Sequence, residues 1–161
     1  MKDDGRDGLP RSEEPDEGGG GIDGGCIAVP NGKYELPYMY YETAMYFGSP
    51  RVVVHCAIDA SDQYAGIEVC RFYNVKEVSQ PTGKYGEYVA LPCGDLVREY
   101  KKLVSDPERM NRISFSVLKG KRLLGRLARV TRSHSRDSLI PEHQYSKIKE
   151  FITVIPDDQW P

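Results

Sequence analysis

The sequence predicts a mainly β protein, a small barrel of five to six strands with one capping helix. Two observations lead to this fold class. Short segments rich in aromatic and β-branched residues recur through the middle and the end of the chain, and only one segment spaces its apolar residues clearly as a helix does. The 161 residues, of which 39% are hydrophobic, suit a single folded domain.

Composition separates this domain from the two ends of the chain. Residues 1–28 are expected to be a disordered acidic tail, because they contain no aromatic residue and carry eight acids against three bases. The barrel domain is expected to cover residues 29–156, and residues 157–161 to form a short acidic C-terminal tail. No segment is apolar over the roughly 18 residues that a membrane span needs, and no secretory signal is visible, so we expect a cytoplasmic protein.

Lys33–Tyr41 is the first expected strand, because it is dense in tyrosines, which favour β structure. Alternation along a strand predicts that one face carries Tyr34, Leu36, Tyr38 and Tyr40. A turn over residues 48–50 is expected to lead into Arg51–Ile58, whose β-branched residues predict a strand buried on at least one side.

Ile67–Val75 is the third expected strand, entered through a tight turn at Tyr64–Gly66. Gly83 and Gly86 then indicate a loop. Tyr85–Leu91 is a candidate for a short fourth strand.

The clearest helix follows this loop. Asp95 is expected to be its N-cap. The apolar residues that recur at helical spacing are Leu96, Val97, Tyr100, Leu103 and Val104. The helix is expected to end just before Pro107, because proline disfavours helical geometry in the residue that precedes it.

Residues Ile113–Ser133 fit two patterns, a helical stripe of leucines and a strand rich in β-branched residues. We expect a short turn at Ser116–Gly120 followed by a strand. The last expected strand is Tyr145–Ile155. These counts fit an OB-like barrel, since the five-stranded oligonucleotide-binding barrel is the commonest small barrel with one capping helix in an intracellular chain.

Six phrases between residues 31 and 155 carry a resemblance to known proteins. They are G-K-Y-E-L at Gly32–Leu36, the turn Tyr41–Thr43, Y-A-G at Tyr64–Gly66, R-F-Y-N-V at Arg71–Val75, D-L-V-R-E-Y at Asp95–Tyr100 and Q-Y-S-K-I at Gln144–Ile148. In this order they resemble a family of small uncharacterised proteins encoded on bacterial mobile elements and prophages. The family is distantly similar to phage single-strand-binding and recombination-accessory proteins, which implies an oligonucleotide-binding barrel.

Patterns of catalytic or metal-binding residues are missing from the sequence. The four cysteines form no C-x-x-C pair and are expected to be reduced and mostly buried. Ser116 and Lys119 have the spacing of serine acyl-enzymes but lack the companion S-D-N and K-T-G elements. His55 lies in an apolar strand, where we expect a satisfied core or surface histidine. We therefore expect no enzyme, no metal and no cofactor.

The net charge of -2 conceals a basic segment, because residues 106–149 hold eleven bases and four acids. Arginine suits phosphate, since its planar guanidinium binds in a bidentate manner and also stacks on bases. The candidate nucleic-acid-binding cations are Lys119, Lys121, Arg122, Arg126, Arg129, Arg132 and Arg136. The candidate stacking residues, expected on one barrel face, are Tyr38, Tyr40, Phe72 and Tyr73. The alternative is a solvated basic face above tyrosines that pack in the core.

These patterns predict single-stranded nucleic-acid binding, to DNA or RNA, and the family resemblance implies that the protein is an accessory protein of a mobile genetic element or prophage. The alternative is a protein-interaction adaptor or a host-takeover or defence-related factor, whose basic face docks on an acidic protein. The C-terminal residues Asp157, Asp158 and Trp160 resemble the acidic tails by which bacterial single-strand-binding proteins recruit partners. The simpler alternative, which the sequence favours, is that Trp160 folds back and covers apolar surface of the barrel.

Overall fold

The computed structural model describes residues 28–104, 113–132, 138–139 and 144–156. The expected acidic head up to residue 27, Arg136 and the tail residues Asp157, Asp158 and Trp160 lie outside this part. The chain divides into a main unit, Asn31–Ala128 with Lys147–Pro161, and a smaller unit, Met1–Pro30 with Arg129–Ser146. Among the described residues, no helix is long and apolar enough to cross a membrane.

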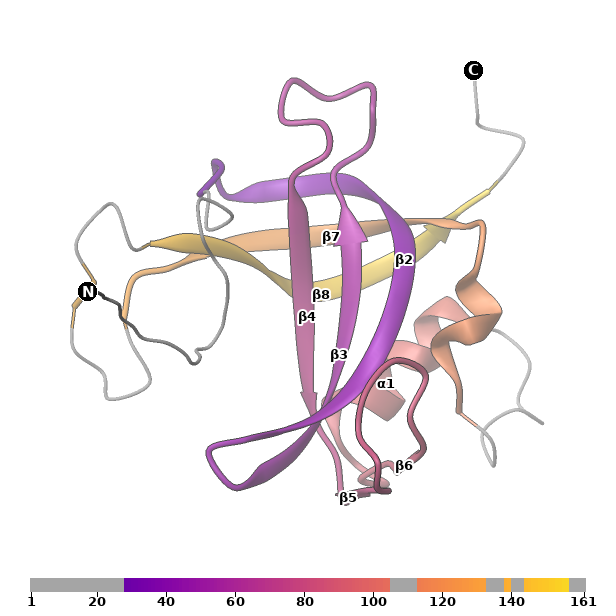
Figure 1. The fold of residues 1–161 in the computed structure, drawn as a ribbon. Coiled ribbons are helices and arrows are strands. Elements are labelled where there is room, and N and C mark those ends of the chain that lie inside the picture. Colours follow the sequence, from indigo (N-terminus) through magenta and orange to yellow (C-terminus); the bar gives the residue numbers. More distant parts are fainter. Residues whose placement is uncertain (1–27, 105–112, 133–137, 140–143, 157–161) are drawn as a thin grey trace, which may run out of the picture. The chain divides into compact units, whose positions relative to one another are not determined.

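Five strands form one antiparallel sheet in the order β4-β3-β2-β7-β8 (Figure 1). The strands are β2 (Gly32–Tyr46), β3 (Ser49–Ala57), β4 (Glu68–Asn74), β7 (Arg122–Val130) and β8 (Tyr145–Ile155). A second, two-stranded sheet pairs β5 (Glu77–Val78) with β6 (Tyr88–Val89). The helices are α1 (Asp95–Leu103) and the short 3-10 helix η3 (Phe115–Leu118). The prediction of a mainly β fold with one main helix is confirmed.

The sheet contains a Greek key. Strands β2, β3 and β4 follow one another as neighbours, and β7 returns after a long connection to lie beside β2, which gives the spatial order of that motif. Within the described residues no pairing joins the edge strands β4 and β8, so the sheet is open there and a closed barrel is not observed. Segment 122–130 is a strand, as expected, because its backbone pairs with the first half of β2.

Strand β2 bends through the sheet and pairs on both sides (Figure 1). Its first half, from Gly32 to Pro37, pairs with β7, and its second half pairs with β3. The register shifts between Tyr38 and Tyr40, which marks a β-bulge. Because the bulge inserts one residue, Tyr41 takes the buried side after Tyr38, and Tyr40 lies on the opposite face. The expectation that Tyr40 shares a face with Tyr38 is therefore wrong.

The β2–β3 hairpin closes more tightly than the sequence predicts. Phe47 and Gly48 both have positive φ angles, 52° and 80°, which is the geometry of a two-residue type I′ turn. Ser49 and Pro50, expected in the turn, already belong to β3. Phe47 is an unusual residue for this position, which normally takes Asn, Asp or Gly.

Helix α1 lies against the core side of the sheet. Its N-cap is Gly94, and Asp95, predicted to be the cap, is the first helical residue. The buried face includes Leu96, Tyr100 and Leu103, as the spacing predicts, and also Glu99. An apolar aromatic cluster joins this helix to the sheet, since the Phe115 ring stacks on Tyr73 and meets the edge of Tyr100, both at 5.6 Å between centroids.

Glu99 is the charged centre of this packing. Its carboxylate accepts hydrogen bonds from the Arg71 guanidinium (2.6 and 3.2 Å), the Tyr73 hydroxyl (2.7 Å) and the Phe151 backbone N–H (3.0 Å). The Glu99 side chain is only 6% exposed, and burying a carboxylate is costly unless such partners accompany it. Glu99 therefore ties α1 to β4 and β8 through polar bonds inside an apolar core.

Candidate functional site

The two faces of β2, β3 and β4 differ in what they contact. On β4, Arg71 and Tyr73 point to the core, where Glu99 binds both. Because side chains alternate along a strand, Cys70 and Phe72 belong to the opposite face, which we call the outer face. The register adds its other members: Tyr40 pairs with His55, His55 with Cys70, and Val53 with Phe72.

The four candidate stacking residues are divided between these faces. Tyr38 and Tyr73 are core residues, 7% and 1% exposed, so their rings cannot receive a base. Tyr40 and Phe72 lie on the outer face and are half-buried. Strand alternation separates Phe72 from Tyr73, and the bulge in β2 separates Tyr40 from Tyr38.

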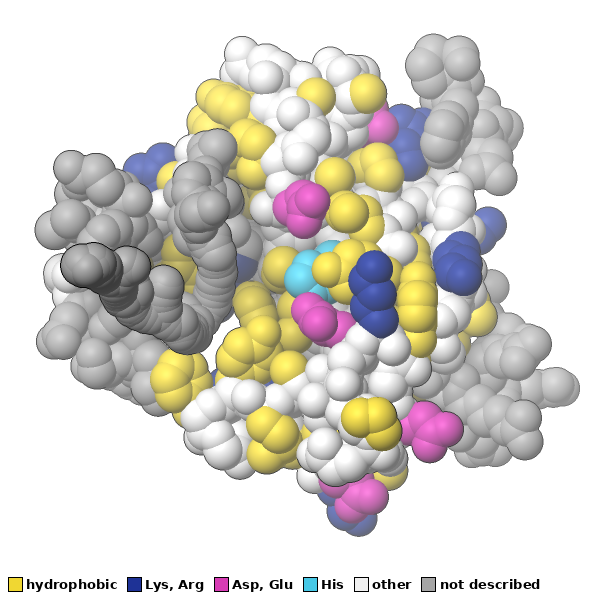
Figure 2. All heavy atoms as spheres, in the orientation of Figure 1, with side chains coloured by type: hydrophobic (Ala, Val, Ile, Leu, Met, Phe, Trp, Pro, Cys, Tyr) yellow, Lys and Arg dark blue, Asp and Glu magenta, His cyan; other side chains and the backbone are white. Residues whose placement is uncertain are grey.

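An aromatic stack occupies the middle of the outer face. The rings of Tyr40 and His55 are stacked with centroids 4.4 Å apart and planes 16° from parallel. The Lys84 ammonium lies 4.3 Å from the centre of the Tyr40 ring, within range of a cation–π interaction. Phe72 meets the edge of Tyr46 at 5.7 Å. Figure 2 shows histidine, acidic and hydrophobic side chains gathered in the middle of the visible face, with a basic side chain beside them.

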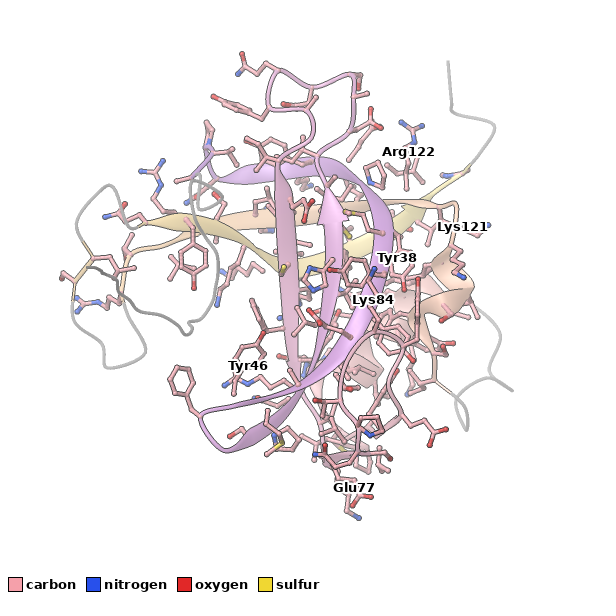
Figure 3. The ribbon with its side chains drawn as sticks, viewed as in Figure 1. Tyr38, Tyr46, Glu77, Lys84, Lys121 and Arg122 are labelled. Carbon is pink, nitrogen blue, oxygen red and sulfur yellow. The ribbon has the colours of Figure 1, made fainter. Side chains whose placement is uncertain are left out.

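Lys84 is positioned by a loop that pairs with the second half of β2. The backbone of Thr43 donates to Gly83 (2.9 Å), Tyr85 donates to Tyr41 (3.0 Å), and Lys84 forms a β-bridge with Glu42. This part of β2 has no strand partner on that side, so the loop satisfies its backbone. Figure 3 shows Lys84 in front of the sheet near β2 and β3.

Tyr85 and Lys119 form a second aromatic and cationic pair. Tyr85 has a φ angle of 57°, a conformation that costs energy for a bulky residue, and its side chain is 42% exposed. The ring meets the edge of Tyr41 at 5.5 Å, and the Lys119 ammonium lies 5.2 Å from its centre. The strained backbone thus holds an exposed ring beside a cation.

A polar cluster lies beside the Tyr40 stack. His55 Nε2 is 2.6 Å from a Glu42 carboxylate oxygen, and His55 Nδ1 is 3.2 Å from the sulfur of Cys70. Burial lowers the pKa of His55, but the hydrogen bonds to Cys70 and Glu42 raise it by more, to about 9. The satisfied histidine expected in this strand thus has an acid on one side and a thiol on the other.

Two of the candidate arginines of the late segment are engaged in ion pairs within the fold. Arg122 is buried and paired with Glu35 at 2.6 Å and with Asp59 at 3.6 Å, and Arg126 is 3.0 Å from Glu150. Lys119 and Lys121 are exposed in the main unit. Arg129 and Arg132 are also exposed but belong to the smaller unit.

The sequence interpretation assigned no binding role to Lys84 or Tyr85 and no partners to His55. Lys84 and Tyr85 appeared only as part of a glycine loop, although the two flanking glycines predict a tight turn that would present both side chains. His55 could not be linked to Glu42 and Cys70, because their proximity depends on the strand register.

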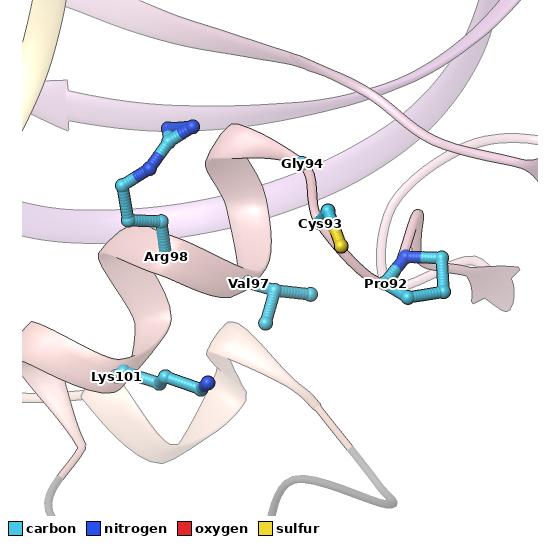
Figure 4. A pocket seen from close by; sticks show the side chains of 6 residues that line it. All are labelled: Pro92, Cys93, Gly94, Val97, Arg98 and Lys101. Carbon is cyan, nitrogen blue, oxygen red and sulfur yellow. The ribbon is translucent and has the colours of Figure 1, made fainter.

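A separate hollow of about 250 Å³ lies at the N-terminal end of α1 (Figure 4). Its lining comprises Pro92, Cys93, Gly94, Val97, Arg98 and Lys101. Arg98 is already engaged in an ion pair with Asp95. The outer face, with its stacked rings and adjacent cations, therefore contains the stronger candidate site.

In the part of the chain that the structure describes, no group of three or more acidic, histidine or cysteine side chains has the geometry of a metal site. Comparisons with protein-family models, with curated proteins and with solved structures find no match for this chain.

Proposed function

We propose that the protein binds single-stranded nucleic acid on the outer face of β2, β3 and β4, without catalysing a reaction. The observation that carries the proposal is the Tyr40–His55 stack with the Lys84 ammonium 4.3 Å from the Tyr40 ring centre. Aromatic rings receive bases, and adjacent cations neutralise the phosphates that connect them.

On the outer face the proposed interface combines Phe72 with one aromatic and cationic pair, and the second pair packs against Tyr41, whose side chain takes the buried side of β2. Lys84 lies over Tyr40, and Lys119 lies over Tyr85. Each base that stacks on an aromatic ring contributes about 1–3 kcal/mol, whatever its identity. Such an interface favours unpaired bases, because the faces of paired bases are already occupied by their neighbours in the duplex.

The proposed fold class is OB-like. An oligonucleotide-binding barrel is a five-stranded, partly open Greek-key barrel that binds its ligand on the face of its second and third strands. In the main sheet the corresponding strands are β3 and β4, which carry His55 and Phe72 on the outer face. The proposed role as an accessory protein of a mobile element or prophage rests on the resemblance of six sequence phrases, which lie in this domain.

Fluorescence anisotropy with labelled single-stranded DNA and RNA tests the proposal. We expect saturable binding to single strands, weaker binding to a duplex of the same length, and a loss of about tenfold in affinity for Tyr40→Ala, which removes one stacking platform. Lys101→Ala, on the exposed side of α1, is the matched control and should leave binding unchanged. Absence of binding at low salt would contradict the proposal.

A protein-interaction adaptor is the second candidate, favoured by the β2–β3 hairpin tip. Phe47 is 61% exposed and Met45 is 51% exposed, and exposed apolar residues of this kind often mark docking sites. A pull-down performed beside the anisotropy assay separates the two functions. Recovery of one defined protein, lost in Phe47→Ser, without nucleic-acid binding would support the adaptor instead.

A further inference from the structure

Three side chains on the outer face form a linear chain of hydrogen-bonding groups. The Cys70 sulfur is 3.2 Å from His55 Nδ1, and His55 Nε2 is 2.6 Å from the Glu42 carboxylate. A thiol, an imidazole and a carboxylate in this order are the groups that activate a sulfur nucleophile, because the carboxylate orients the ring and the ring exchanges a proton with sulfur.

The sheet fixes this geometry. Cys70, His55 and Glu42 come from β4, β3 and β2, and His55 lies directly opposite Cys70 in the strand register. The Tyr40 ring, stacked on His55, holds the imidazole plane from the other neighbouring strand. The positions of all three groups therefore depend on backbone pairing rather than on a flexible loop.

The charges around His55 favour its protonated form. The groups that face it are Glu42, which is anionic, Cys70 and Tyr40. The raised pKa of His55, about 9, agrees with a ring that donates from Nε2 to the carboxylate and from Nδ1 to sulfur. A thiolate is the better acceptor of a hydrogen bond from an imidazolium, and it is the reactive form of cysteine.

We propose that Cys70 is an activated thiol that forms mixed disulfides with small disulfide compounds. The Cys70 thiolate attacks one sulfur of the disulfide, a new bond forms between the two sulfurs, and the original sulfur–sulfur bond breaks. The leaving thiolate takes a proton from solvent. Cys70 is oxidised, and one half of the disulfide compound is reduced to a thiol.

Two other described cysteines provide contrasts within the same molecule. Cys93 is exposed in the loop before α1, and Cys56 is completely buried in the core. Accessibility alone would make Cys93 more reactive than the half-buried Cys70. The proposed activation reverses this order.

Reaction of the full chain with oxidised glutathione at neutral pH tests the proposal, with each cysteine followed separately by peptide mass spectrometry. We expect glutathione to add to Cys70 faster than to Cys93. In His55→Asn and Glu42→Gln the rate at Cys70 should fall by about tenfold or more, while the rate at Cys93 stays unchanged.

Cys56 reports whether each variant is folded, because it reacts only when the core opens. A Cys70 rate at or below that of Cys93 in the unsubstituted protein would overturn the proposal, whatever the variants do. An unchanged Cys70 rate in a folded His55→Asn or Glu42→Gln protein would overturn it as well. This measurement does not involve oligonucleotides. If the protein fails to bind nucleic acid, the proposal for Cys70 is therefore unaffected.

Discussion

Glu99 and Glu42 show how burial decides what a carboxylate does. The Glu99 side chain is 6% exposed and serves as an anchor for Arg71, Tyr73 and the backbone of β8. The Glu42 side chain is 30% exposed and bonds only to His55 among the described contacts. The first therefore contributes chiefly to stability, and the second chiefly to the charge on the outer face.

Loss of the Glu99 charge should destabilise the protein strongly. In Glu99→Ala the Arg71 guanidinium, which is 12% exposed, would remain buried without its main partner. Breaking a buried ion pair in this way costs about 3–5 kcal/mol. Urea unfolding measures the change. Arg98→Ala is the control, because its pair with Asp95 is exposed and should contribute less than about 1 kcal/mol. A similar small change in both variants would show that the Glu99 cluster does not hold α1.

His55 should make stability depend on pH. Its pKa is about 9 in the folded protein and 6.5 in a model peptide, so its contribution to stability is fully present below pH 6.5 and is lost as the pH rises through 9. The difference between these two pKa values, about 2.5, corresponds to roughly 3–4 kcal/mol. Urea unfolding of the unsubstituted protein and of His55→Gln should give free energies that converge between these pH values. A difference that is constant with pH would contradict the raised pKa.

At the scale of the element, alternating apolar patterns predict the strands but not the contacts between them. The tyrosine-rich segment before Glu42 forms a strand as expected. The bulge after Tyr38 arises from the pairing of this strand with β3, and the alternating pattern of one strand holds no information about its partner. Segment 113–133 was ambiguous for the same reason, because its pairing with β2 selects the strand. The burial of Glu99 could not be predicted from the sequence, since a carboxylate on a helix is normally exposed to solvent.

The β2–β7 contact depends on a glycine. A Cβ atom at Gly125 would lie 2.7 Å from Leu36 Cδ1 and 3.4 Å from the Glu150 carbonyl oxygen. Leu36 is completely buried, so its side chain would have to repack within the core to make room. Gly125→Ala should therefore lower the stability of the protein by about 1–3 kcal/mol through overpacking.

Thermal melting measures this effect. Thr153→Ala, at an exposed position of β8, is the control and should change stability by less than about 0.5 kcal/mol. An unchanged melting temperature in Gly125→Ala would mean that the two strands tolerate a wider separation.

At the scale of the whole molecule, the two faces of the sheet in the main unit differ: one holds α1, and the other is the face on which we propose binding. The core face holds α1 through Glu99 and the aromatic cluster around Phe115. The outer face presents Tyr40 and Phe72, with the Lys84 ammonium beside the Tyr40 ring. Arg122, one of the predicted phosphate-binding arginines, is instead paired with Glu35 within the fold.

Salt dependence should identify the cations that bind phosphate. Lys84→Ala should reduce the slope of log affinity against log salt by about 0.7, the value for one phosphate contact on a single strand. Arg122→Lys keeps its charge, and we expect it to leave the slope unchanged, because this side chain is buried against Glu35. The slopes come from anisotropy titrations at several salt concentrations. Equal slopes for Lys84→Ala and the unsubstituted protein would remove Lys84 from the proposed interface.

Photo-cross-linking to a bromouracil-containing single strand tests the proposed interface most directly, because it locates the bases without altering the protein. The outer-face account predicts that peptide mass spectrometry finds cross-links at Tyr40 or Phe72 and none at residues of α1. Cross-links confined to α1, or to the hairpin tip at Phe47, would contradict it.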